Sequence, residues 1–302
     1  MDSIPGVIGG SGRLDHWLAD HKQDVDALLQ DKGAVLMRGF DVPDPQAFDA
    51  AVEAYGEAGF TYSESLSNAV RVNVTERVFT ANEAPPSTEI YLHHEMAQTP
   101  LYPSKLFFYC EIAPHEGGAT PLCRSDLLYS RMKDADAAQA EAFAARGVRY
   151  SNVMPDENDA GSGQGRSWRS TLGVDTREAA EARLASLGYD WEWRDDDSLR
   201  ATTPVLPAVR TLLDGRETFF NQLIAAFRGW SDARNDPARA ITFGDGEPIL
   251  AEHMRSVIQL SDELAHDHQW QAGDVVLVDN FAVMHGRRPF SGKRRVLASL
   301  VS

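Results

Sequence analysis

The sequence predicts a mainly β fold, with one all-β core, flanking helices and two long loop insertions. Short apolar runs of strand length recur along the 302 residues, and helical patterns do not alternate regularly with them. Regular alternation would instead indicate a parallel α/β sheet. Length alone allows about two domains, but no repeat and no long linker divides the sequence. We therefore expect one domain over residues 1–302.

Five segments carry the apolar spacing, the capping residues or the alanine content of helices. Asp44 and Pro45 supply an N-cap and a first helical position, and residues 175–178 open another helix in capping-box style. The last helix ends at His266 and His268, which we interpret as a solvated helix end rather than as metal ligands. The predicted helices cover residues 14–29, 45–55, 134–146, a segment from 175 onward, and 248–267.

Seven segments are typical of strands, because they are short apolar runs or alternate apolar and polar residues. Residues 106–110 are apolar and aromatic throughout, as expected of a strand that is buried on both faces. A turn at Gly273 introduces a second buried strand. The predicted strands cover residues 34–37, 71–74, 104–112, 148–153, 218–222, 273–280 and 294–301.

Two polar stretches, residues 156–166 and 231–242, interrupt the pattern of strands. The first contains three glycines, but it is not a phosphate-binding loop, because no strand leads directly into it and no Lys-Ser/Thr pair follows. We expect both stretches to be lids within insertions at about residues 154–175 and 228–245.

The formal charge is −16, from 45 acidic and 29 basic residues. A nucleic-acid-binding protein needs a basic patch, and attraction to anionic lipid also needs positive charge, so we expect neither kind of partner. The N-terminus lacks the pattern of a signal peptide. No apolar window approaches the roughly 20 residues that span a bilayer. We therefore expect a cytoplasmic protein, and the sequence leaves its oligomeric state open.

The segment 91–98 contains the first candidate for chemistry, because His93 and Glu95 lie two positions apart in an apolar, strand-like run. In an extended chain such residues point to the same face, whereas on a helix they would diverge by about 200°. With a histidine from elsewhere they would form the two-His-one-carboxylate triad of non-haem Fe(II) enzymes. The alternative is a surface pair on a half-exposed strand.

His285 follows the predicted strand 273–280 and is either the third metal ligand or a structural histidine. Arg294 and Arg295 open the C-terminal strand. An inward-facing arginine is costly unless it is paired, and a carboxylate ligand would pair it in bidentate geometry. Alternation along the strand turns one of the two arginines inward, but spacing alone does not decide which one.

Taken together, the motifs resemble those of the Fe(II)/2-oxoglutarate-dependent dioxygenases of the taurine dioxygenase (TauD/TfdA) superfamily. The resemblance is strongest to the branch of the syringomycin-type aspartyl hydroxylase and the clavaminate-synthase-like enzymes. It implies a double-stranded β-helix (jelly-roll) core with helical and loop insertions. The matching segments are residues 35–40, 92–97, 108–110, 117–122, 219–222, 243–246, 273–280, 285–287 and 289–295.

The resemblance implies roles for individual residues. His93, Glu95 and His285 would be the iron ligands, and the variable residue between the first two would point away from the metal. Arg295, the second of the paired arginines, would bind the distal carboxylate of 2-oxoglutarate, and Thr120 would donate a hydrogen bond to it. Related halogenases have a small residue in place of the carboxylate ligand, so the presence of Glu95 disfavours halogenation.

The implied cofactors are Fe(II), the cosubstrate 2-oxoglutarate and O₂. The implied reaction hydroxylates an unactivated C–H bond and releases succinate and CO₂. The expected substrate is an amino acid or an amino-acid-derived biosynthetic metabolite, either free or on a carrier protein. Arg71, Gln98 and Asn221 are candidates for binding it, with structural roles equally open. The alternatives are desaturation, epoxidation or rearrangement at the same centre, a zinc hydrolase, and a non-catalytic jelly-roll binding protein.

Overall fold

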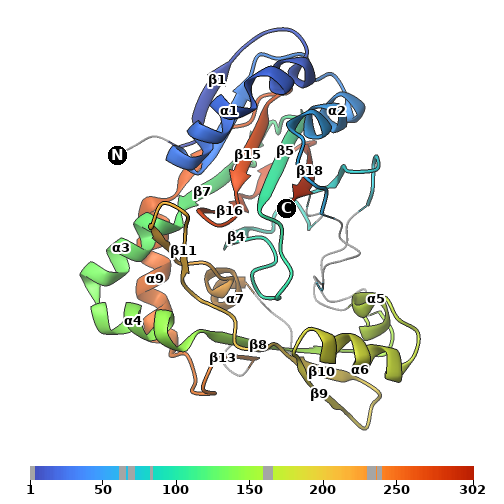
Figure 1. The fold of residues 1–302 in the computed structure, drawn as a ribbon, viewed down its shortest axis with the longest axis vertical. Coiled ribbons are helices and arrows are strands. Elements are labelled where there is room, and N and C mark those ends of the chain that lie inside the picture. The colour runs from blue at the N-terminus through green and yellow to red at the C-terminus, as the bar shows by residue number, and fades with distance from the viewer. Residues whose placement is uncertain are drawn as a thin grey trace.

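The computed structural model describes residues 4–60, 66, 72–81, 84–158, 166–229, 236 and 240–302. Two β-sheets form its core, with helices on their outer faces (Figure 1). The helices are α1 Leu14–Lys32, α2 Pro45–Tyr55, α3 Ser125–Ala135, α4 Ala137–Arg146, α5 Trp168–Leu172, α6 Arg177–Ser186, α7 Leu223–Gly229 and α9 Ala251–Leu264. None of the helices in these described ranges is long and apolar enough to cross a membrane.

The strands of the first core sheet are β1 Gly6–Gly9, β2 Ala34–Arg38, β15 Val275–Asp279, β5 Lys105–Ile112, β18 Arg295–Val301 and β3 Phe79–Thr80, in that spatial order. The strands of the second are β14 His266–His268, β7 Thr120–Arg124, β16 Val283–Arg287 and β4 Ile90–His93. The remaining strands are β6 Glu116–Gly117, β8 Val148–Met154, β9 Asp190–Trp193, β10 Leu199–Thr202, β11 Arg210–Thr211, β12 Glu217–Thr218, β13 Ile241–Phe243 and β17 Phe290–Ser291.

The two core sheets pack against each other through one apolar cluster. Leu106, Val276 and Val296 enter it from the six-stranded sheet, and Leu122 and Val283 enter it from the four-stranded sheet. The neighbours in the four-stranded sheet pair antiparallel, and the six-stranded sheet adds the parallel pair β1–β2 at one edge. This is the predicted jelly-roll core with helical insertions, and its sheets do not close into a barrel.

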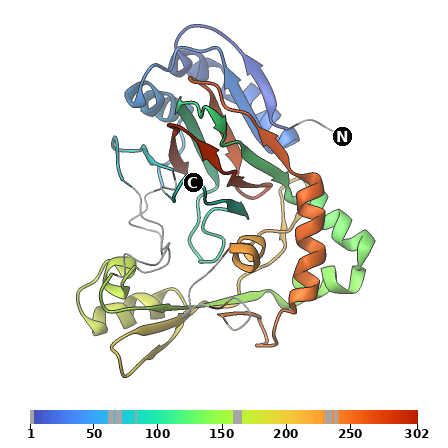
Figure 2. The same ribbon diagram turned by 180° about the vertical axis from the view of Figure 1, so that it is seen from behind.

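Helices α1 and α2 cover the outer face of the six-stranded sheet, as the view from behind also shows (Figure 2). Side chains alternate along β5, so Phe107 and Tyr109 face these helices, whereas Leu106 and Cys110 face the interior between the sheets. Burying a large apolar side chain contributes about 1.5–3 kcal/mol. The all-apolar sequence of β5 is therefore explained by the burial of both its faces.

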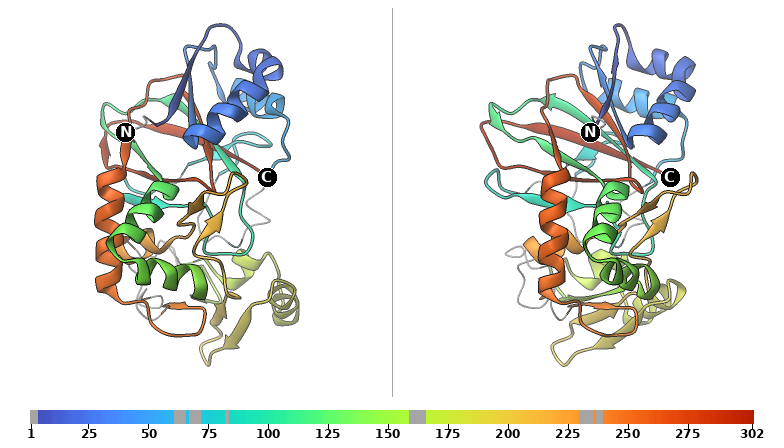
Figure 3. Two further views of the ribbon diagram at one scale, coloured as in Figure 1. Left: turned by 60° about the vertical axis from the view of Figure 1, so that its left-hand side comes forward. Right: turned by 90° about the vertical axis from the view of Figure 1, so that its left-hand side faces the viewer.

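Two further groups of elements complete the described structure: a pair of helices on the four-stranded core sheet, and a separate sheet with its own helices. Helices α3 and α9 lie side by side against the core sheet (Figure 3), and Leu128, Val257 and Met284 belong to the apolar cluster between them and the sheet. Strands β13, β8, β10 and β9 form a separate four-stranded sheet. Helices α5 and α6 pack on that sheet through Trp168 and Leu184.

Two predicted elements have the wrong extent because polar residues end them early. The predicted helix 134–146 is two helices, since the backbone of Asp136 is extended and its side chain accepts a hydrogen bond at the start of α4 from the N–H of Gln139. The predicted strand 218–222 stops at Thr218, and α7 follows soon afterwards.

The predicted helix 248–267 ends at Leu264, and His266–His268 form strand β14. This strand pairs with β7 and extends the four-stranded sheet by one edge strand. His268 is buried, with 4% of its surface exposed. The interpretation of the two histidines as a solvated helix end is therefore wrong, because backbone pairing to β7 outweighs the continuation of the helix.

Some predictions fall on parts of the chain beyond the described residues. Arg71 lies outside them, as do residues 159–165 and most of 231–242, so the two expected lids have no structural test. Within the predicted strand 71–74, Asn73 forms an isolated bridge to β3 rather than a strand.

Candidate active site

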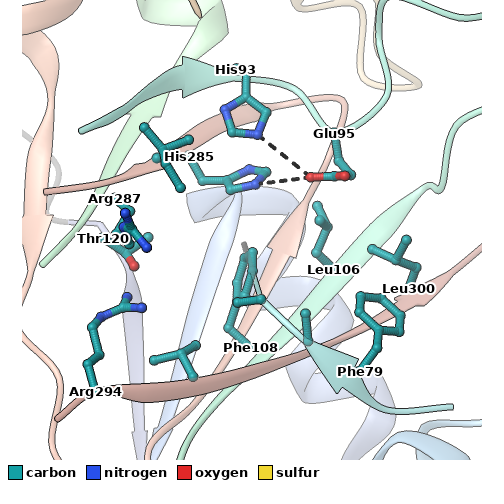
Figure 4. A pocket seen from close by; sticks show the side chains of 15 residues that line it. Phe79, His93, Glu95, Leu106, Phe108, Thr120, His285, Arg287, Arg294 and Leu300 are labelled. Atoms are coloured by element: carbon teal, nitrogen blue, oxygen red, sulfur yellow. Dashed lines mark ion pairs between the residues drawn. The ribbon is translucent and has the colours of Figure 1, made fainter. Parts of the chain in front are cut away.

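Two strands that are far apart in the sequence bring two histidines and one glutamate together. His93 ends β4 and pairs in register with His285 of β16. Their Nε2 atoms lie 3.7 and 3.5 Å, respectively, from Oε2 of Glu95 (Figure 4). One donor atom from each side chain lies within 4.8 Å of the other two. Two imidazoles and one carboxylate in this arrangement match the donor set of non-haem Fe(II) oxygenase sites.

Glu95 reaches the histidines from a turn rather than from within strand β4. The strand ends at His93, and Met96 adopts a left-handed conformation with φ of 58°. Asn280 holds this turn, because its Oδ1 accepts the N–H of Glu95 at 2.8 Å and its Nδ2 donates to the carbonyl of Glu95 at 3.0 Å. Sequence reasoning gave Asn280 no role, because its contact with a residue 185 positions away leaves no local pattern in the sequence.

Hydrogen bonds also fix the orientation of the histidines in the 93–95 segment. Nδ1 of His93 donates to the carbonyl of Tyr91 at 2.8 Å, which leaves the lone pair of Nε2 for a metal. His94 points away, as expected: its Nδ1 bonds the carbonyl of Asn280, and its Nε2 accepts from the hydroxyl of Ser125 at 2.6 Å. Burial lowers the pKa of His94 to about 3, so it stays neutral at physiological pH.

The two histidines and the glutamate line a cavity whose two ends differ in chemistry, which we call the polar end and the apolar end (Figure 4). The polar end is lined by Thr120, Arg287 and Arg294, and the apolar end by Phe79, Leu106 and Leu300. The candidate metal ligands therefore lie between a cationic surface and a water-excluding one.

The structure places Arg294, and not Arg295, in the cavity. Alternation along the C-terminal strand decides this, because positions 294, 296, 298 and 300 line the cavity. The side chain of Arg295 is 42% exposed, and its Nη1 pairs with Oε2 of Glu111 at 2.6 Å. The expectation that the second arginine of the pair faces the cosubstrate is corrected accordingly.

Arg294 is built to hold an anion. Its Nε donates to the carbonyl of Gly118 at 3.1 Å, which places it beside the turn that leads to Thr120. No carboxylate pairs with it in the part of the chain that the structure describes. Burial, together with the charge of Arg287, lowers the pKa of Arg294 to about 10. A buried cation without a counter-ion is costly, so a carboxylate of a bound acid fits this place.

Arg287 serves a different purpose at the polar end. Its guanidinium donates to the carbonyls of Ala84, Pro85 and Thr88 at 2.9, 2.8 and 2.8 Å. These three residues precede β4, which carries His93. Arg287 therefore ties the approach to one candidate ligand strand onto β16, the other ligand strand.

The candidate substrate residues do not assemble around the cavity. Arg71 lies outside the described residues. Gln98 is not among the residues that line the cavity, and its buried Oε1 has no hydrogen-bond partner in the described part of the chain. Asn221 donates to the carbonyl of Ala208 at 3.1 Å and accepts from the N–H of Leu223 at 3.0 Å, so it organises the start of α7.

Comparisons with known proteins agree with this geometry. The profile of the family described as "Taurine catabolism dioxygenase TauD, TfdA family" matches residues 4–300. The chain is 43% identical over 280 residues to the clavaminate synthase-like protein At3g21360 of Arabidopsis thaliana, covering 92% of this chain and 84% of that protein. It is 28% identical over 302 residues to the dapdiamide synthesis protein DdaC of Enterobacter agglomerans, covering 95% and 87%.

Among solved structures, a taurine dioxygenase from Burkholderia xenovorans has a similar fold. The TM-score is 0.51 at 16% identity, over 94% of this chain and 82% of that one. The family profile spans almost the whole sequence and, with these relatives, supports an oxygenase enzyme rather than a non-catalytic binding protein. The chain belongs to the TauD/TfdA family, and it is an oxygenase that uses Fe(II), 2-oxoglutarate and O₂ to oxidise a small molecule.

Proposed function

We propose that this enzyme hydroxylates an unactivated C–H bond of an amino acid or an amino-acid-derived metabolite. We further propose that His93, Glu95 and His285 hold Fe(II), and that Thr120 and Arg294 bind the distal carboxylate of 2-oxoglutarate. The observation that carries this proposal is the cavity itself, in which the three donor side chains lie between an apolar wall and a buried arginine that has no carboxylate partner among the described residues.

The residues present fit both absent groups. Two neutral imidazoles and a carboxylate suit Fe(II) and leave room for other ligands, and a guanidinium beside a hydroxyl suits a carboxylate. When bound, Fe(II) with 2-oxoglutarate and O₂ supplies the oxidation, in which the cosubstrate loses CO₂ to become succinate and a C–H bond of the substrate becomes C–OH.

The protein's own contribution is position and exclusion of water. Arg294 and Thr120 would hold the far end of the cosubstrate, so that its keto-acid end lies toward the histidines. The walls formed by Phe79, Leu106 and Leu300 would receive the carbon that is oxidised. A dry wall protects a reactive oxidant from side reactions with water.

The substrate class is supported by the sequence relatives. The resemblance of the motifs is strongest to a branch that contains an aspartyl hydroxylase, and one relative is named for dapdiamide synthesis. We therefore propose an amino-acid-like substrate, either free or on a carrier protein. Hydroxylation is the outcome that we propose first. Desaturation, epoxidation or rearrangement at the same centre would depend on where the substrate C–H bond lies relative to the metal.

The test is an anaerobic titration of the purified protein with Fe(II) and 2-oxoglutarate, followed by absorption spectroscopy. We expect the weak visible charge-transfer band of a metal-chelated keto acid, which shifts when the right amino acid is added. Product analysis after admission of O₂ should then show addition of one oxygen atom and one equivalent of succinate. Absence of the band from folded, iron-loaded protein would contradict the assignment of the site.

A further inference from the structure

We propose that Trp270 is a positioning residue for the cosubstrate: its indole N–H fixes the Thr120 hydroxyl so that the hydroxyl proton points into the cavity. Trp270 is not among the residues that line the cavity, and it acts through Thr120. This inference rests on the proposed function, since it assumes that Thr120 binds the distal carboxylate of 2-oxoglutarate.

The contact between the two side chains is direct and buried. Nε1 of Trp270 lies 3.0 Å from Oγ1 of Thr120, and the two residues are 7% and 6% exposed. An indole N–H can only donate, whereas a hydroxyl has one proton and two lone pairs. The Thr120 oxygen is therefore the acceptor in this bond, and its proton remains to be donated elsewhere. A carboxylate can only accept, so the bond prepares Thr120 for the ligand.

Hydrogen bonds and an ion pair to Asp274 stabilise the turn that follows Trp270. The carboxylate of Asp274 accepts hydrogen bonds from Nε and Nη2 of Arg38 at 2.7 and 2.6 Å. Its Oδ2 also accepts a hydrogen bond from the backbone N–H of Gln271 at 2.8 Å. His268 packs edge-on against the indole at 4.5 Å and pairs in register with Thr120 across the sheet. The distance between Trp270 and Thr120 is thus set by main-chain pairing and by a half-buried ion pair between Arg38 and Asp274.

A second buried tryptophan shows that packing alone does not require the hydrogen bond. Trp168 is 1% exposed in the cluster beneath α5 and α6. Its Nε1 has no hydrogen-bond partner among the described residues. Among the described residues, a buried indole is therefore tolerated without a partner for its N–H, and the partner of Trp270 is a residue of the cavity.

The experiment is a double-mutant cycle on 2-oxoglutarate binding, measured by anaerobic calorimetry on Fe(II)-loaded protein. Trp270→Phe keeps an aromatic ring and removes the donor, and Thr120→Val removes the hydroxyl at constant shape. A single hydrogen bond to a charged group is worth roughly tenfold in affinity, so we expect each variant to weaken binding about five- to tenfold. The double variant should be no weaker than Thr120→Val, because Trp270 acts only through that hydroxyl.

The control variant is Trp168→Phe, which should leave the affinity for 2-oxoglutarate unchanged. Additive effects in the cycle, or full affinity in Trp270→Phe, would overturn the role of Trp270 while Thr120→Val still weakens binding. Full affinity in Thr120→Val would instead overturn the assignment of Thr120 under the proposed function. The two failures are therefore distinguishable.

A second measurement needs neither metal nor cosubstrate. In the ¹⁵N–¹H spectrum, the indole signal of Trp270 should move upfield and its hydrogen exchange should accelerate in Thr120→Val. The signal of Trp168 should not change. An unchanged Trp270 signal would overturn the proposal, and this readout remains usable if Trp270→Phe fails to fold.

Discussion

The two sides of the cavity are built by different means. Beside the candidate metal ligands, contacts to the backbone set the positions: His93 and His285 are cross-strand partners, and the side chain of Asn280 bonds the N–H and the carbonyl of Glu95. At the polar end, the alternation of side chains along one strand turns Arg294 toward the cavity and leaves Arg295 at the surface. The comparison shows that a ligand motif of fixed spacing can be recognised in the sequence. Which of two adjacent arginines faces the cavity cannot, because it depends on the exact register of the strand.

The largest effect is expected when one of the candidate metal ligands is removed. Glu95→Ala removes the only carboxylate of the candidate site among the described residues. Since loss of an outer partner of a metal ligand already costs about 10- to 100-fold, we expect loss of the ligand to lower turnover by more than about 1,000-fold. The charge-transfer band should also disappear. Glu116→Ala, at an exposed position, is the matched control, and retained activity in Glu95→Ala would contradict the assignment.

The next effect tests the polar end. Arg294→Ala should raise the KM for 2-oxoglutarate about 100-fold, because truncating one partner of a buried charge pair costs about 2–5 kcal/mol. Fe(II) affinity should change little. Arg295→Ala removes the neighbouring arginine, which pairs with Glu111 at the surface, and should leave the KM within about twofold. The reverse order of the two effects would restore Arg295 as the cosubstrate ligand.

A third variant tests whether the contact of the Asn280 side chain with the backbone of Glu95 matters for metal binding. Asn280→Asp keeps an acceptor for the N–H of Glu95 but removes the donor to its carbonyl. We expect the affinity for Fe(II), measured by calorimetry, to fall about 30-fold. The control is Asn221→Asp, since Asn221 also bonds backbone on both sides but lies off the cavity. Equal metal affinities in the two variants would show that Asn280 is a folding residue only.

The smallest effect concerns the buried histidine behind the polar end. Burial lowers the pKa of His268 from 6.5 to about 4. Between these two values His268 is protonated in the unfolded chain and neutral in the folded one. The contribution of His268 to the free energy of unfolding is therefore present above pH 6.5 and is lost as the pH falls toward 4. Between pH 6.5 and 5.5 the loss is about 1 kcal/mol. Urea unfolding of metal-free protein should show this slope, and His268→Phe should reduce it; an unchanged slope would exclude His268 as its source.

Much of the fold could be predicted because its core elements carry strong local signals. Residues 34–37, 104–112 and 273–280 are apolar runs that become β2, β5 and β15, and Asp44 caps α2 as expected. Strand β14 was missed, because His266–His268 have no strand pattern of their own and depend on β7 for pairing. Such tertiary pairing leaves no periodic trace in the sequence.

The candidate site divides in the same way. The structure brings His93, Glu95 and His285 together, as the resemblance of the motifs implies, whereas residue reasoning alone left the role of His285 open. Asn280 and Trp270 were missed, because each acts through another residue and carries no distinctive spacing. These supporting residues become visible only when hydrogen-bond partners are known.

The pairing of His93 with His285 also affects the order of events during synthesis and folding of the chain. The two residues are 192 positions apart (285 − 93 = 192), so the donor set is spread over almost two thirds of the polypeptide. During synthesis, β4 emerges long before β16, and closing so long a loop has to await the C-terminal strands. With the iron ligands proposed above, iron loading would be a late event that follows completion of the fold, and a chain truncated before β16 would lack His285 and could not complete the proposed site.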